Sequence, residues 1–139
     1  MVTIRQAGQG DWSRIRDFYE RTQYSSPLHA SDRILLAETD SGIVGAVRLC
    51  YEGGVHVLRG MRVLERMRHR GIGTELLHAT EGIFLDAVCY CIPYDHLEDF
   101  YGRAGFRKLP IADAPAFLRE RWHEYRSRDL KVILMKRSR

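Results

Sequence analysis

The sequence is poor in the features that mark secreted, zinc-binding and membrane-spanning proteins. Its three cysteines, Cys50, Cys89 and Cys91, form neither an even set nor a CxxC pair, and all lie in apolar runs. We therefore interpret them as reduced core or pocket residues. Zinc binding by Cys89 and Cys91 with a histidine is the weaker alternative. Because no second ligand pair follows at zinc-site spacing, we predict no metal site.

Long apolar runs are missing as well. None is long enough to span a bilayer, and the N-terminal stretch MVTIRQAGQGDW lacks the apolar core of a signal peptide. We expect a cytoplasmic protein with no membrane partner.

The composition is that of a folded protein. With 139 residues, of which 45% are hydrophobic and 29% charged, the chain is long enough for one core and too short for two ordinary domains. We therefore predict a single domain over residues 1–139.

The positive charge is concentrated in one segment. The net charge is +4, and between Arg59 and Arg70 there are five arginines and His69 against one acid, Glu65. Such a cluster favours an anionic ligand or partner. A solvated loop with basic side chains is the alternative interpretation.

Patterns typical of strands and helices alternate along the chain. Strand patterns occupy residues 2–6, 34–38, 43–51, 55–63, 85–92, 106–111 and 130–136. Helical spacing follows Asp11 and Asp113, which we predict as N-caps, and it also follows Gly73, while residues 95–104 indicate a short helix. Gly60 lies inside a strand pattern and indicates a bulge or a close backbone approach. This order predicts an α/β (α+β) fold with a mixed central sheet of about six to seven strands flanked by helices.

The segment RHRGIGTELLHA places Gly71 and Gly73 between a strand and a helix. Free N–H groups and the macrodipole make a helix N-terminus favourable for negative charge, and glycine lets a diphosphate approach the amides. A nucleotide-triphosphate loop would need a GK[ST] ending, and a dinucleotide fingerprint would need a third glycine at Leu76, so both are disfavoured. A plain tight turn is the other interpretation.

Two motifs resemble the signatures of a known family. RHRGIG, residues 68–73, is similar to the (Q/R)xxGx(G/A) motif of the Gcn5-related N-acetyltransferases (GNAT), and FYGRAGF, residues 100–106, resembles their FYxxxGF signature. The resemblance extends over residues 2–136 in element order. It implies that acetyl-CoA binds with its pyrophosphate on the amides of residues 68–74 and its pantetheine arm along residues 61–63. The cofactor-binding residues that it implies are Met61, Arg62, Val63, Arg68, His69, Arg70, Gly71, Ile72, Gly73, Thr74, Tyr101 and Arg103.

The resemblance also implies the reaction, which is attack of an amine on a thioester. Tyr101 corresponds to the tyrosine that in many members protonates the departing thiolate, and a phenol with an ordinary pKa of about 10 is protonated at neutral pH. A tyrosine that only packs in the core is the alternative. A backbone N–H near Met61 would polarise the thioester carbonyl.

No motif identifies the general base. Some members carry a glutamate or a histidine at the position of Val57, which cannot accept a proton. The candidates are His56 and Glu52, with Asp95 or Glu98 acting through water as further ones. A member without a dedicated base would accept amines that are already neutral.

The acceptor pocket is inferred from position in the family. Tyr24, His29, Arg59 and Tyr94 are the candidate substrate residues, and Tyr94 stands where many members have an asparagine. A basic rim favours an acceptor that also carries a carboxylate or a phosphate.

Three functions are compatible with these observations. We expect an N-acetyltransferase that transfers an acetyl group from acetyl-CoA to a primary amine of a small molecule or peptide by direct attack. The alternatives are a catalytically inactive acyl-CoA-binding module and an acyltransferase acting on a nucleic-acid-linked amine such as aminoacyl-tRNA. Nucleic acid ranks last, because the arginines already have a use on the cofactor's phosphates. A homodimer is left open, with residues 114–128 and 130–136 as the surfaces of interest.

Overall fold

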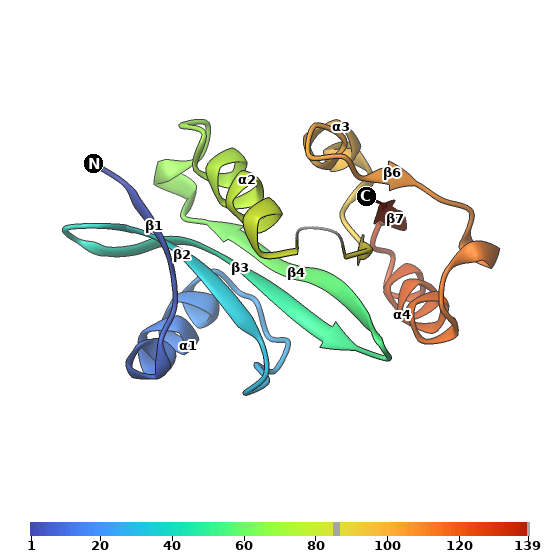
Figure 1. Cartoon of the computed structure of the whole chain (residues 1–139), viewed down its shortest axis with the longest axis horizontal. Coiled ribbons are helices and arrows are strands. Elements are labelled where there is room, and N and C mark those ends of the chain that lie inside the picture. The colour runs from blue at the N-terminus through green and yellow to red at the C-terminus, as the bar shows by residue number, and fades with distance from the viewer. Residues whose placement is uncertain (85–86, 139) are drawn as a thin grey trace.

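The chain folds into one mixed sheet with helices on both faces (Figure 1), and the computed structural model describes residues 1–84 and 87–138. Within these residues seven strands are ordered β1-β2-β3-β4-β5-β7-β6. The strands are β1 Thr3–Gln6, β2 Arg33–Thr39, β3 Gly42–Glu52, β4 Val55–Val63, β5 Cys89–Cys91, β6 Arg107–Lys108 and β7 Met135–Arg137. The main helices are α1 Trp12–Arg21, α2 Ile72–Phe84, α3 Glu98–Gly102 and α4 Ala116–Ser127. The predicted fold class is confirmed.

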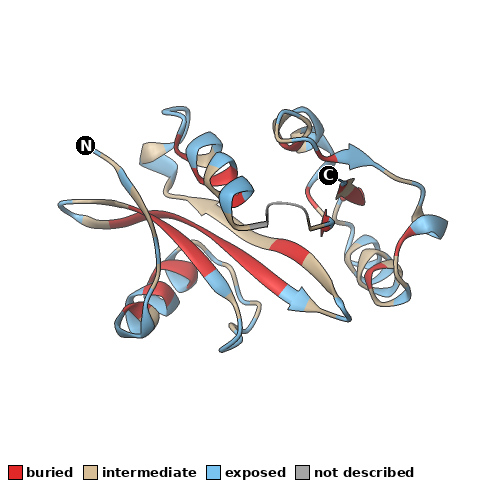
Figure 2. Cartoon of the chain, viewed as in Figure 1, coloured by how far each residue is buried: buried red, intermediate tan, exposed pale blue. Residues whose placement is uncertain are grey.

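Both faces of the sheet are covered, because the central strands alternate two sets of apolar side chains. In β2, Ile34 and Leu36 pack with α1, whereas Leu35 and Ala37 point to the opposite face and pack on the α2 side. Helix α4 covers the far end of the α1 face, where Leu118 meets Val57 and Tyr90. Figure 2 shows the buried stretch running along the middle of the sheet, with the outer sides of the helices exposed.

Strands β4 and β5 form the parallel pair of this sheet, and they stay together for a short distance. Their register is His56 with Cys89, Val57 with Tyr90, and Leu58 with Cys91. Beyond the last pair, β4 continues to Val63 while β5 has ended, so the two strands part. The candidate site lies at this opening.

Several predicted elements are shorter than their sequence patterns. The strand predicted at 85–92 is reduced to β5, and residues 85–86 lie outside the described residues. The pattern at 106–111 is reduced to β6, because Pro110 cannot donate a ladder hydrogen bond and the chain turns into the 3-10 helix η4, Ile111–Asp113. The predicted strand 130–136 forms sheet pairs as β7 from Met135 on.

Two helix predictions are corrected by the structure, and a third is correct in position only. The segment predicted as one helix at 95–104 is a 3-10 turn, Asp95–Leu97, followed by α3. Asp113 is not the N-cap of α4, since Pro115 occupies that position. Asp11 does lie at the N-cap position of α1, but its carboxylate makes no capping hydrogen bond to the helix backbone. Its Oδ2 accepts from the N–H of Gly8, 2.8 Å away, and its Oδ1 accepts from the side chain of Arg14.

Candidate active site

A β-bulge in β4 interrupts the regular pairing of β3 and β4 at the centre of the site. Arg59 lies opposite Arg48 and Arg62 lies opposite Ala46, so β4 has one more residue than β3 over this stretch. Gly60 has φ +63°, and a Cβ there would come within 3.0 Å of Arg48 Cδ. The position therefore requires glycine, and the bulge predicted from Gly60 is confirmed.

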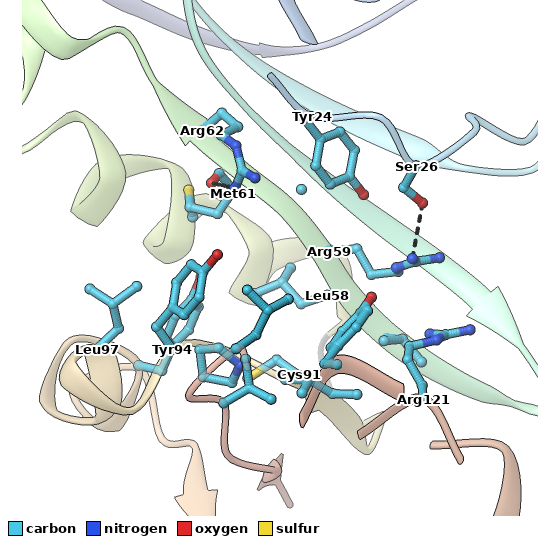
Figure 3. Close-up of a pocket in the computed structure, with 18 of the residues that line it drawn as sticks. Tyr24, Ser26, Leu58, Arg59, Met61, Arg62, Cys91, Tyr94, Leu97 and Arg121 are labelled. Carbon is cyan, nitrogen blue, oxygen red and sulfur yellow. Dashed lines mark hydrogen bonds between the residues drawn. The ribbon is translucent and has the colours of Figure 1, made fainter. Parts of the chain in front are cut away.

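A cavity of about 330 Å³ opens where β4 and β5 part (Figure 3). Leu58 and Met61 of β4 and Cys91 of β5 form its middle. Residues from both faces of the sheet complete it. They are Tyr24, Ser25 and Ser26 from the α1 face, Leu97 and Tyr101 from the α3 side, Arg121 and Tyr125 from α4, and Arg128 directly after α4. The cavity therefore borders elements from both faces of the sheet.

The glycine segment forms the N-terminus of α2, on the face opposite α1. Gly71 has φ +80°, and the first hydrogen bond of the helix runs from the N–H of Glu75 to the Gly71 carbonyl over 2.9 Å. The amides of Ile72, Gly73 and Thr74 precede that bond, so they lack acceptors within the helix and add to its positive end. Arg68, His69 and Arg70 are exposed beside them.

The two sequence motifs touch each other in the structure. A Cβ built at Gly73 would lie 3.3 Å from Cζ of Phe100, which belongs to the FYGRAGF segment. Glycine at this position therefore allows α3 to pack close to the first turn of α2. Open space next to Gly71, free amides and neighbouring arginines fit the requirements of a diphosphate.

Tyr101 joins the second motif to the cavity. Its side chain is 7% exposed and makes edge-to-face contacts with Phe100 and Phe106, with ring centroids 4.9 and 6.0 Å away. Burial raises the pKa of Tyr101 above the ordinary value of 10.0, and the proximity of Cys91 raises it further. The phenol is therefore protonated at neutral pH and borders the cavity, as an acid for a leaving group must.

A buried arginine that sequence reasoning missed organises the α1 side of the cavity. Arg48 is 2% exposed, and it donates hydrogen bonds to Asp32 Oδ2 at 2.7 Å, Tyr24 Oη at 2.6 Å and the Pro27 carbonyl at 3.0 Å. It thereby fixes the loop before β2 against β3. The available signal was a charged residue inside the apolar run IVGAVRLC, where an arginine must find partners.

The base candidates lie away from the cavity wall. The ring of His56 lies 5.0 Å from the ring of Tyr51 and is tilted against it, and burial lowers the pKa of His56. Glu52 makes ion pairs with Arg121 at 2.6 Å and Arg59 at 3.5 Å, which hold its carboxylate behind those side chains. Neither residue, nor Asp95 or Glu98, borders the cavity.

The other residues predicted for the site fall into two groups, those that border the cavity and those that do not. Tyr24, Arg59, Met61, Arg62, Tyr94 and Tyr101 border the cavity. His29 does not: it is exposed, and its Nδ1 lies 2.8 Å from Ser31 Oγ. Arg103 is exposed beyond the end of α3. Val63 ends β4 on the far side of the bulge.

The cysteines carry no charge at neutral pH. Burial raises the pKa of Cys50 and of Cys89 to about 12, and it also raises that of Cys91. Over residues 1–84 and 87–138, no group of three or more His, Cys, Asp or Glu side chains is arranged to hold a metal ion.

The fold is that of an acetyltransferase. Residues 30–108 match the family model described as "Acetyltransferase (GNAT) domain", which is more than half of the chain. The chain belongs to the GNAT acetyltransferase family.

Solved structures of the same fold are similar at low sequence identity. Escherichia coli ElaA has a TM-score of 0.72 at 15% identity, covering 99% of this chain and 100% of its own. An acyl-CoA N-acyltransferase from Pseudomonas aeruginosa has a TM-score of 0.72 at 18% identity, with the same coverage of both chains. No curated protein matches the sequence closely enough to count as a relative.

A larger protein contains a similar domain. The N-acetylglutamate synthase of Neisseria gonorrhoeae, solved in complex with coenzyme A and N-acetyl-glutamate, has a TM-score of 0.66 at 20% identity. The match covers 99% of this chain and 35% of the synthase, so the chain spans about a third of that protein.

In the part of the chain that the structure describes, no helix has the length and apolar character needed to cross a membrane.

Proposed function

We propose that the protein transfers an acetyl group from acetyl-CoA to a primary amine of a small molecule or peptide by direct attack. The observation that carries this proposal is that the elements of both sequence motifs and the bulged strand lie around one cavity. The bulged β4, the end of β5 and Tyr101 all border it, and the α2 N-terminus packs against the same helix that carries Tyr101. A GNAT-fold neighbour solved with coenzyme A supports the choice of donor.

The chain offers separate groups for each part of acetyl-CoA. The amides of residues 72–74, with the side chains of Arg68 and Arg70, would hold the diphosphate. Beyond Leu58, the edge of β4 that faced β5 has no strand partner among the described residues. Its backbone groups over residues 61–63 can pair with an extended ligand as another strand would. When bound, acetyl-CoA supplies an acetyl group activated as a thioester.

The residues around the cavity then have distinct tasks. Tyr101 Oη holds a proton that can be given to the leaving sulfur, and burial keeps that proton in place. The Met61 amide, in the bulge, is the proposed donor to the acyl oxygen. No Asp, Glu or His among the described residues borders the cavity, so we assign no general base. We propose that the amine enters neutral and releases one proton to water after it has attacked the thioester carbon.

The test is acetyl transfer to a panel of amines. The protein would be incubated with acetyl-CoA and each amine, while thiol release is followed and the acetylated product is identified by mass spectrometry. Amine-dependent release together with a product heavier by one acetyl group is expected. Hydrolysis without an acetylated product would contradict the proposal.

The absence of a base among the cavity residues favours a second candidate, an inactive acyl-CoA-binding module. This module would bind acetyl-CoA as tightly as an enzyme does. It would transfer acetyl to no amine at any pH up to 10, where many amines are largely neutral. Transfer that increases as the amine loses its proton excludes it.

A further inference from the structure

The β4 bulge brings two arginines to one side of the sheet. In a regular strand, residues three apart point to opposite faces. Here Arg59 lies opposite Arg48 and Arg62 lies opposite Ala46. Ala46 and Arg48 are two residues apart and share a face, so Arg59 and Arg62 share it too. Both side chains border the cavity from the α1 face (Figure 3).

The charges that border the cavity are all positive. Arg59, Arg62, Arg121 and Arg128 contribute to its wall, and no acidic side chain of the described residues does. Behind the wall, Glu52 binds Arg121 through both oxygens, at 2.6 and 3.2 Å, and lies a longer 3.5 Å from Arg59. One carboxylate is therefore shared by two guanidinium groups and is placed closer to Arg121.

Arg62 has neutral neighbours. Its Nη1 donates to the Met61 carbonyl over 3.2 Å, and its guanidinium lies 5.0 Å from the centre of the Tyr24 ring. Arg59 donates to Ser26 Oγ over 3.0 Å. The buried Arg48 anchors the segment that carries Tyr24 and Ser26. The groups that contact Arg59 and Arg62 are therefore held in place. A net positive charge therefore lies on the α1 side of the cavity, which is the side proposed for the acceptor.

We propose that the acceptor amine carries a carboxylate, and that Arg59 and Arg62 bind this carboxylate. The inference rests on the proposed acetyl transfer and names its substrate class, a small amino acid or another amino-carboxylate. Planar guanidinium groups match a carboxylate in geometry as well as in charge. The cavity volume, about 330 Å³, lies at the small end of ligand pockets. Met61 lies between the two arginines in β4, so a carboxylate held by them keeps the amine of a short molecule near the proposed acyl site.

The same charges disfavour other acceptors. A diamine would bring a second ammonium group against the arginines and be repelled. An amide in place of the carboxylate would lose the charge-assisted hydrogen bonds, which are worth a factor of about 10 to 100 in binding. A phosphate offers similar chemistry to guanidinium groups, so the test must include it.

The experiment compares matched acceptors with the intact protein. Glycine, β-alanine and 4-aminobutyrate are paired with their carboxamides, with 2-aminoethyl phosphate and putrescine alongside. Values of kcat/KM are corrected for the fraction of neutral amine in each case. We expect at least one acid to exceed its amide by about 10-fold or more. Arg62→Gln and Arg59→Gln should reduce that ratio to about 1. Arg126→Gln, at an exposed position that does not border the cavity, should leave it unchanged.

Acetyl-CoA binding, measured by calorimetry on every variant, separates the two proposals. Failure of the wild-type protein to bind would remove the proposed function itself. Transfer with equal rates for acids and amides, or a ratio that both Gln variants leave intact, would overturn the carboxylate site while acetyl transfer stands. A preference for 2-aminoethyl phosphate over every carboxylate would also overturn it. Binding without transfer to any acceptor of the panel would overturn both.

Discussion

Arg48 and Asp32 form an ion pair of 2.7 Å in which the side chains are 2% and 3% exposed. Arg48 lies in the middle of β3, and Asp32 ends the loop that contains Tyr24 and Ser26. The pair therefore connects the most buried part of the sheet to the wall of the cavity. A charge at such a depth depends on its partner, because removing one partner leaves the other buried without compensation.

Replacement of Arg48 by methionine should destabilise the protein strongly. The Asp32 carboxylate would remain buried without its cation, which costs about 3–5 kcal/mol in the free energy of unfolding. The double variant Arg48→Met/Asp32→Leu should lose less than Arg48→Met alone. Urea denaturation monitored by circular dichroism measures both.

The matched control for this experiment is Arg128→Met. The ion pair of Arg128 with Glu124 is more than half exposed on both sides and contributes about 0–1 kcal/mol. Equal losses for Arg48→Met and Arg128→Met would show that the buried pair is not structurally important.

Gly60→Ala should destabilise the protein and reduce acetyl transfer together. At φ +63° a side chain is strained, and the new Cβ would lie 3.0 Å from both Arg48 Cδ and Tyr19 Oη. We expect a loss of about 1–3 kcal/mol in the free energy of unfolding. Gly82→Ala is the control, because it lies in α2 with open space around it and should be neutral or stabilising by up to about 1 kcal/mol. Equal effects of the two changes would contradict the bulge.

Tyr101→Phe should lower kcat about 100-fold or more while leaving the affinity for acetyl-CoA within about 2-fold. Loss of the hydroxyl removes the proton held for the leaving group but keeps the ring contacts with Phe100 and Phe106. Steady-state kinetics and calorimetric titration measure the two quantities. Tyr90→Phe provides the control, since Tyr90 is equally buried at 7% and packs towards α4.

The pH profile gives a second check on Tyr101. Because burial raises the pKa of Tyr101 above 10.0, the phenol keeps its proton through the range in which the amine loses its own. We expect kcat/KM to rise with pH and show no decline up to pH 10. A decline near pH 8 or 9 would mean that the acid is another group.

Acid should destabilise the protein through the cluster at the start of α1. Hydrogen bonds from Arg5, the Gly8 N–H and Arg14 lower the pKa of Asp11 well below its ordinary value. A lowered pKa in the folded state stabilises the fold above the unfolded-state pKa of about 3.9, and this contribution is lost as the pH falls below it. Between pH 7 and pH 3, Asp11→Asn should lose less stability than the wild-type protein. Asp17→Asn, on the exposed side of α1, should lose as much as the wild type.

Features governed by local rules were predictable from the sequence. Gly60 and Gly71 stand where the backbone has positive φ, and glycine is the residue that adopts this conformation without strain. The alternation of Leu35 and Leu36 between two cores follows from the pleat of a strand. These rules need no knowledge of distant partners.

Features that depend on distant partners were not predictable. The length of β5 is set by where it stops pairing with β4, at Leu58 and Cys91, although its apolar pattern continues in both directions. The role of Arg48 depends on Asp32 and Tyr24 folding over it from another segment. His56 and Glu52 were sensible base candidates by type, but their neighbours Tyr51 and Arg121 hold them elsewhere.

The most direct test of the account is calorimetric titration of acetyl-CoA into the wild-type protein and into Arg70→Glu. Arg70 is exposed beside the α2 N-terminus, so the charge reversal places a negative charge at the proposed diphosphate site without disturbing the core. Arg21→Glu, at the end of α1 on the opposite face, is the matched control. We predict micromolar binding that Arg70→Glu weakens by at least about 10-fold and Arg21→Glu leaves unchanged. Absence of binding by the wild-type protein, or equal binding by all three, would contradict it.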